Sequence, residues 1–135
     1  MRFMMLMYPG IGPDAESWNP SAEDVAAMTA YNEELSKAGV LLSLDGLRPP
    51  VDGARVTFSG STPAVTDGPF AEAKEVVGGY WLIQAKSKEE AVEWASRCPA
   101  GEGDVIEVRR VFEMEDFPED VQAAAQLSER PPEQT

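Results

Sequence analysis

Histidine is absent from this sequence of 135 residues. Its absence excludes Ser-His-Asp and Cys-His nucleophile pairs, metal sites built on histidine, and histidine general bases. Any chemistry must therefore use carboxylates, Lys, Tyr, Ser or the single cysteine. The sequence also lacks the spacing of an EF-hand or of a phosphate-binding loop, and we expect neither a metal nor a cofactor.

Cysteine and long apolar runs are scarce as well. Cys98 is the single cysteine, so no internal disulfide can form, which favours a reducing compartment and predicts a cytoplasmic location. The apolar run Phe3–Tyr8 is too short for a signal peptide or a membrane span, and we expect no membrane association. A run of this length is more typical of a buried strand.

Positive charge is in short supply. The chain has 11 Lys and Arg residues against 24 Asp and Glu residues, which gives a formal net charge of −13. Such a surface repels phosphate backbones, so we expect no nucleic-acid partner. Residues 113–135 hold seven acidic side chains and one basic one, so the rest of the chain carries −7. Solubility is the simplest role for this charge.

Hydrophobic periodicity divides residues 1–117 into strands and helices that form one domain. Helices are expected at Ser21–Ala38 and Ser87–Cys98, and each opens on a serine followed three residues later by an acidic side chain, as in a capping box. Strands are expected at residues 2–8, 40–45, 55–59, 64–66, 76–85 and 104–112. This order predicts an α+β, ferredoxin-like split β-α-β fold: an antiparallel sheet with two helices on one face, plus a small hairpin. The acidic tail, residues 118–135, is expected to be partly helical, over Glu119–Leu127, or disordered.

The sheet face turned away from the helices also has large apolar candidates. They are Met4, Leu6, Tyr80 and Leu82. A sheet face this apolar is usually covered by a second subunit, so the sequence predicts a homodimer.

A long ordered stretch, Thr66–Tyr80 (TDGPFAEAKEVVGGY), resembles the signature of the DGPF, or YCII-related, domain family. The similarity continues through the helix segment Glu90–Ala95 and the strand segment Ile106–Arg109, and it covers roughly residues 1–112. The resemblance implies a ferredoxin-like fold that pairs into a dimeric α+β barrel. It also links some relatives to sigma-factor-dependent transcription, but it implies little about activity.

The wider YCII group has a proposed active dyad, made of a histidine near the start of the first helix and an aspartate. The corresponding region here carries Glu23, Asp24 and Val25. Because the chain has no histidine, neither member of the dyad is transferred to it.

The turn Asp67-Gly68-Pro69-Phe70 has two interpretations. In the structural one, Asp bonds the backbone, Pro fixes φ, Gly allows a positive φ and Phe packs into the core. In the functional one, Asp67 caps a pocket as an acceptor or general base, and is the candidate catalytic residue.

The charged residues Lys74 and Glu75 follow this turn closely. Their side chains are either solvated or face a ligand. Gly78-Gly79 inside the next predicted strand indicates a bulge or a close approach to the backbone. The candidate ligand-binding residues are Asp67, Gly68, Pro69, Phe70, Lys74, Glu75 and Tyr80.

Three functions stay open on these residues. The first is a small-molecule-binding or regulatory dimer without catalysis. The second is a cofactor-free lyase or isomerase that uses carboxylate acid-base chemistry in the barrel pocket. The third is a module whose acidic surface binds a basic protein.

Overall fold

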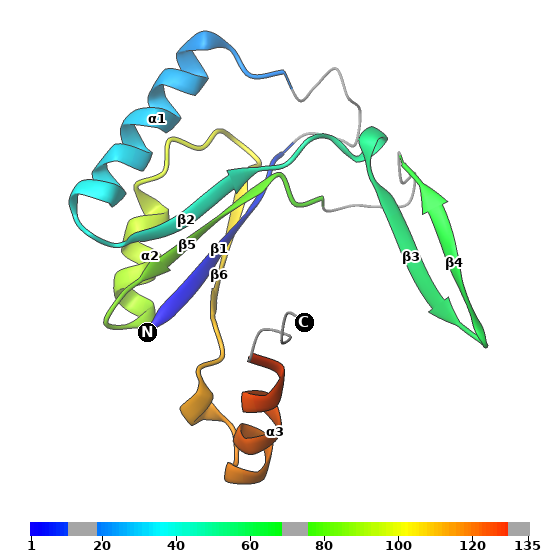
Figure 1. The fold of residues 1–135 in the computed structure, drawn as a ribbon. Coiled ribbons are helices and arrows are strands. Elements are labelled where there is room, and N and C mark those ends of the chain that lie inside the picture. Colours follow the sequence, from blue (N-terminus) through cyan, green and yellow to red (C-terminus); the bar gives the residue numbers. More distant parts are fainter. Residues whose placement is uncertain (11–18, 69–75, 130–135) are drawn as a thin grey trace, which may run out of the picture.

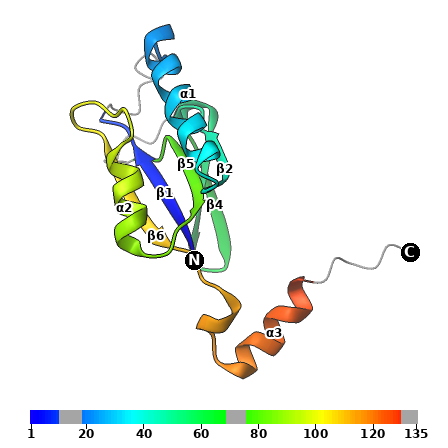
Figure 2. The ribbon, with the colours of Figure 1, turned by 90° about the vertical axis from the view of Figure 1, so that its left-hand side faces the viewer.

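A computed structural model describes residues 1–10, 19–68 and 76–129, and its centre is one four-stranded antiparallel sheet. The sheet has the order β2-β5-β1-β6, formed by β1 (Arg2–Tyr8), β2 (Leu41–Gly46), β5 (Gly79–Gln84) and β6 (Val105–Arg110). Helices α1 (Ala22–Lys37) and α2 (Lys88–Ser96) lie on one face of it (Figures 1 and 2). Two strand-helix-strand halves in this order are consistent with the ferredoxin-like fold, and the α+β class is confirmed.

Both sheet-covering helices begin where the sequence predicts. The backbone N–H of Asp24 donates to the Ser21 hydroxyl at 3.0 Å, and that of Glu90 donates to Ser87 at 3.1 Å. The Glu90 carboxylate in turn accepts from the N–H of Lys86 at 2.8 Å. These bonds satisfy amide groups that a helix start leaves without an intrahelical partner.

The core lies between the helices and the sheet. Alternate residues of the two central strands, Phe3 and Met5 on β1 and Trp81 and Ile83 on β5, are buried there. From α1, Tyr31 packs edge-on against Trp81 with ring centroids 5.8 Å apart, and its hydroxyl donates to the carbonyl of Trp94 on α2 at 2.7 Å. The period of two along each strand therefore puts one set of side chains in the core and the other set on the opposite face.

β5 starts later than expected, at Gly79 instead of Val76. The register shift of the sheet also lies elsewhere, in β2 between Leu41 and Ser43, so the bulge predicted at Gly78-Gly79 is wrong. The close approach predicted there is present instead: a Cβ on Gly79 would lie 3.0 Å from the carbonyl oxygen of Asp45. A side chain at this position would push β2 away from β5.

The second face of the sheet carries the side chains that the sequence assigns to it. Met4, Leu6, Tyr80 and Leu82 are half-buried in the two central strands, on the side away from α1 and α2. Polar side chains flank them. These are Ser43 and Asp45 on β2, and Glu107 and Arg109 on β6. We call this surface the free face; its cover by a second subunit stays a prediction.

Two further units extend from this core. β3 (Ala54–Ser59) and β4 (Thr62–Asp67) form a separate two-stranded sheet, and α3 (Glu119–Glu129) follows a short 3-10 turn at Met114–Asp116. The helix expected in the tail is therefore present. Within the described residues, no helix is long and apolar enough to cross a membrane.

Candidate functional site

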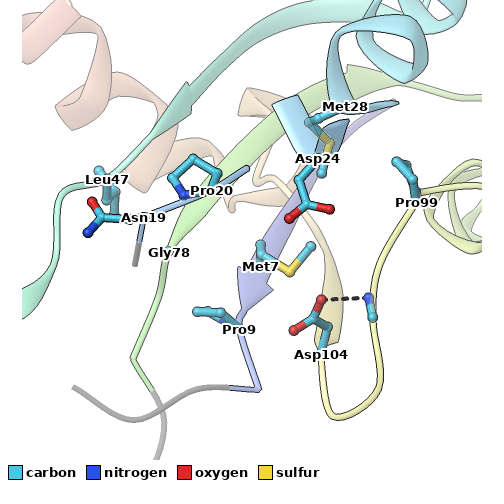
Figure 3. Close-up of a pocket in the computed structure, with 11 residues that line it drawn as sticks. Met7, Pro9, Asn19, Pro20, Asp24, Met28, Leu47, Gly78, Pro99 and Asp104 are labelled. Atoms are coloured by element: carbon cyan, nitrogen blue, oxygen red, sulfur yellow. Dashed lines mark hydrogen bonds between the residues drawn. The ribbon is translucent and has the colours of Figure 1, made fainter. Parts of the chain in front are cut away.

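A cleft of about 560 Å³ opens on the helix side of the sheet, where β1 ends and α1 begins. Its apolar surface comes from Met7 on β1, Met28 on α1 and Leu47 after β2. The full lining is Met7, Pro9, Asn19, Pro20, Asp24, Met28, Leu47, Gly78, Pro99, Gly101 and Asp104 (Figure 3). We call it the Met7 cleft.

Two carboxylates give the Met7 cleft its charge. Asp24 lies in the first turn of α1 and points toward Met7, and Asp104 lies in the loop between α2 and β6 (Figure 3). Asp104 is held by two backbone donors, the N–H of Gly10 at 2.7 Å and that of Gly101 at 2.8 Å. The cleft therefore combines apolar walls with negative charge, which suits a ligand with an apolar body and a cationic or donor group.

A second cavity of about 250 Å³ adjoins the first and shares Met7, Met28 and Gly78 with it. It extends along the β2-β5 edge and is also bordered by Asp45 and Tyr80. The side chains of these two residues stand on the free face, where the Tyr80 hydroxyl donates to the Asp45 carboxylate at 2.8 Å. This hydrogen bond to Asp45 raises the pKa of Tyr80 above its usual value, so the phenol stays protonated and acts as a donor at neutral pH. Nearby, Trp81 donates to the side-chain oxygen of Asn32 at 2.8 Å, which fixes the inner wall.

A family model for the YCII-related domain matches residues 1–115. The chain belongs to the YCII-related family. It is also 35% identical over 68 residues to an uncharacterized protein of Rhizobium meliloti (strain 1021). That similarity covers 50% of this chain and 55% of the relative, so the chain spans about half the length of the curated relative it matches.

In this YCII-related protein the start of α1 borders the Met7 cleft and presents Asp24. The histidine that the wider group has near this point has no counterpart in the chain. The carboxylates of Asp24 and Asp104 are thus the charged groups that its cleft offers.

The residues proposed from sequence are only partly brought together. Asp67 ends β4, is exposed and pairs across the ribbon with Ala54, and it does not line either cavity. Gly68 donates its N–H to the Gly53 carbonyl at 2.9 Å and lies against the carbonyl of Pro50. Pro69, Phe70, Lys74 and Glu75 lie outside the described residues. The Asp67 site stays a prediction.

Tyr80 is the candidate from sequence that borders a described cavity, the smaller of the two. Sequence reasoning did not identify Asp24 or Asp104, which line the Met7 cleft. Asp24 reads as part of a helix cap, and it does belong to one. Asp104 follows Gly101-Glu102-Gly103, a turn signal that places a polar residue at a strand start. Neither pattern indicates that Asp24 and Asp104 line the same cleft, because eighty positions separate them in the sequence.

Other reactive groups are poorly placed for chemistry at neutral pH. Burial raises the pKa of the Cys98 thiol to about 11, so the nucleophilic thiolate is scarce. Among the residues that the structure describes, no group of three or more Cys, Asp or Glu side chains is arranged to hold a metal ion.

Proposed function

We propose that this YCII-related protein is a homodimeric small-molecule-binding module whose ligand occupies the Met7 cleft. The observation that carries the proposal is the combination in one cleft of Met7, Met28 and Leu47 with the carboxylates of Asp24 and Asp104. The volume, about 560 Å³, is in the range of small-molecule sites. A ligand with a flat apolar body and a protonated amine matches both features.

The dimer part of the proposal rests on the free face. Met4, Leu6 and Leu82 stand on the two central strands, on the side of the sheet opposite α1 and α2. Two copies joined through these faces would form the dimeric α+β barrel that the family resemblance implies. Polar residues at the sheet edges would form the rim of that interface.

In this proposal the protein has a regulatory role. The family resemblance connects it with sigma-factor-dependent transcription, and a ligand cleft whose described lining residues include no strong nucleophile suits sensing better than covalent chemistry. The acidic surface argues for a protein contact over a direct contact with DNA.

One contact favours a second candidate, a cofactor-free lyase or isomerase. Asp45 and Tyr80 form a carboxylate–phenol pair on the free face, and such a pair can accept a proton on one group and donate from the other. A metabolite that co-purifies with the protein would then exchange a carbon-bound proton with D₂O, and Asp45→Asn would abolish that exchange. No exchange in the wild-type protein would dismiss this candidate.

Methyl NMR of ¹³C-labelled methionine tests the binding proposal. The probe is tryptamine, a protonated amine on an aromatic body. We expect it to shift the methyl signals of Met7 and Met28, which line the cleft, and to leave that of Met114 in the 3-10 turn unchanged. Asp24→Asn should weaken binding by about two- to fivefold, as expected for an exposed ion pair.

The matched probe is indole-3-propionate, which has the same ring and the opposite charge, and it should bind more weakly than tryptamine. Glu23→Gln is the matched variant, because Glu23 precedes Asp24 in α1 but does not line the cleft. Equal binding of the two probes, or equal effects of the two variants, would contradict the assignment of Asp24.

A further inference from the structure

The hairpin formed by β3 and β4 stands apart from the main sheet. Its two strands pair with each other in a two-stranded sheet of their own. In Figure 1 helices α1 and α2 lie to one side of the four-stranded sheet and the hairpin to the other, and Figure 2 shows α1 and α2 in front and the hairpin behind. The hairpin therefore projects on the same side as the free face. We call it the arm.

The register of the arm gathers its apolar side chains on one of its faces. Val56 lies opposite Val65, Phe58 lies opposite Pro63, and Ala54 lies opposite Asp67 at the base of the same face, which therefore carries one carboxylate there. Phe58 is 81% exposed, Val65 67% and Val56 51%. The opposite face is polar, with Arg55, Thr57, Ser59, Thr62 and Thr66. An amphipathic ribbon like this one is built to cover an apolar surface.

An isolated two-stranded ribbon is only marginally stable in water, so the arm needs a partner for its apolar face. At its base the arm is fixed: the N–H of Gly68 donates to the Gly53 carbonyl at 2.9 Å, and Gly68 lies against the Pro50 carbonyl without room for a side chain. These contacts set the direction of the arm and leave Phe58 and Val65 uncovered.

The size of the free face points to a second copy as the occupant. A six-residue strand is about 20 Å long and neighbouring strands lie about 4.8 Å apart, so a four-stranded face has a flat footprint of roughly 400 Å², which is less than its accessible surface because side chains stand out from it. A standard interface buries about 800 Å² of accessible surface on each partner. The apolar side chains of the free face stand mainly on the two central strands, with Val105 on β6, and polar residues flank them, so the arm would add apolar contact that this face lacks at its edges.

Charge favours the same occupant. The strands of the arm carry one basic and one acidic side chain, Arg55 and Asp67, so their net charge is zero. Two chains with a net charge of −13 each repel one another, and a neutral arm extends their contact without adding to that repulsion.

We propose that the arm clasps the second subunit, so that Val56, Phe58 and Val65 pack against the partner once two free faces are joined. This inference rests on the proposed homodimer. Each subunit then contributes an arm on either side of the two-fold axis, and the arms supply apolar contact that the two sheets lack. Loss of the arm contact would leave a weaker dimer that is still joined through the sheets.

Sedimentation equilibrium of arm variants tests the clasp. Phe58→Ser combined with Val65→Ser should raise the dimer dissociation constant by about tenfold or more, because large apolar anchors dominate interface energetics. The matched control, Thr57→Ser with Thr66→Ser, changes the polar face of the same ribbon and should shift the constant by less than about twofold. Circular dichroism and tryptophan fluorescence verify that both variants keep the folded domain.

Hydrogen exchange of the wild-type chain gives a readout without any variant. Amides of residues 54–67 should become protected as the concentration rises through the dimer dissociation constant. A wild-type chain that stays monomeric would overturn the proposed homodimer itself. A dimer whose constant is insensitive to the Phe58 and Val65 substitutions, with residues 54–67 unprotected at all concentrations, would overturn the clasp and leave the homodimer standing.

Discussion

Gly79 is a single residue that allows two strands, β2 and β5, to lie close together. It is buried at the start of β5, where its backbone passes the Asp45 and Gly46 positions of β2. A Cβ there would lie 3.0 Å from the Asp45 oxygen, and that oxygen belongs to backbone that cannot turn aside. The smallest residue therefore keeps β2 close enough for the Tyr80–Asp45 hydrogen bond on the free face.

Gly79→Ala should lower the free energy of unfolding by about 1–3 kcal/mol, the usual cost of forcing an extra methyl group into a packed site. Gly46→Ala is the matched control, since a Cβ at Gly46 has nothing within 4 Å, and it should be neutral or slightly stabilising. Urea denaturation measures both. Equal effects at the two glycines would refute this account of the close approach.

Single residues also make the stability of the segment between β6 and α3 depend on pH. The Arg2 guanidinium donates to Glu113 at 2.9 Å and holds the pKa of that carboxyl below its usual value. The backbone N–H of Glu113, with help from Arg110, does the same for Asp116. A carboxylate with a lowered folded-state pKa stabilises the fold above its ordinary pKa, and this contribution is lost as the pH falls through the lowered value.

Glu113→Gln should therefore be less stable than wild type at neutral pH, by an amount that stays constant down to about pH 5. The difference should shrink below the ordinary glutamate pKa of about 4.3, because the unfolded wild-type chain then binds a proton at Glu113 that the folded chain, with its lower pKa, does not bind. Urea denaturation from pH 3 to pH 7 checks this. A stability difference that is the same at every pH would show that the Arg2 pair does not titrate as described.

At the scale of elements, local signals explain most of what could be predicted. Ser21 and Ser87 cap their helices as the sequence indicates, and alternation along β1 and β5 separates core from free face. The predicted start of β5 at Val76 is too early. Val76 and Val77 have strand propensity, but pairing with β2 stops where that strand ends at Gly46. The Met7 cleft could not be read in the same way, since it depends on loops that meet only in three dimensions.

Removing residues 129–135 should leave the melting temperature unchanged. The segment (ERPPEQT) has no apolar residue that could anchor it to a core. Differential scanning calorimetry of the shortened and full chains measures the effect. A drop of more than about 4 °C would mean that the segment contributes on the order of 1 kcal/mol, contrary to this prediction.

At the scale of the whole molecule, two elements with exposed apolar side chains lie on the same side of the main sheet. The free face and the arm both lie on the side of the sheet away from α1 and α2 (Figure 1). The first was visible in sequence as strands that are apolar on both faces. The exposure of the arm could not be predicted from the sequence, because a short hairpin with alternating side chains is equally typical of a ribbon that packs onto its own domain.

Sedimentation velocity at micromolar concentration tests the homodimer most directly. The account predicts a species of twice the 14.7 kDa chain mass, and Leu82→Glu should convert it to a folded monomer, because a charge at the centre of the free face would be buried without a partner. Val92→Glu, which adds the same charge on the outside of α2, should leave the dimer intact. A wild-type chain that sediments as a 14.7 kDa monomer at these concentrations would contradict the account.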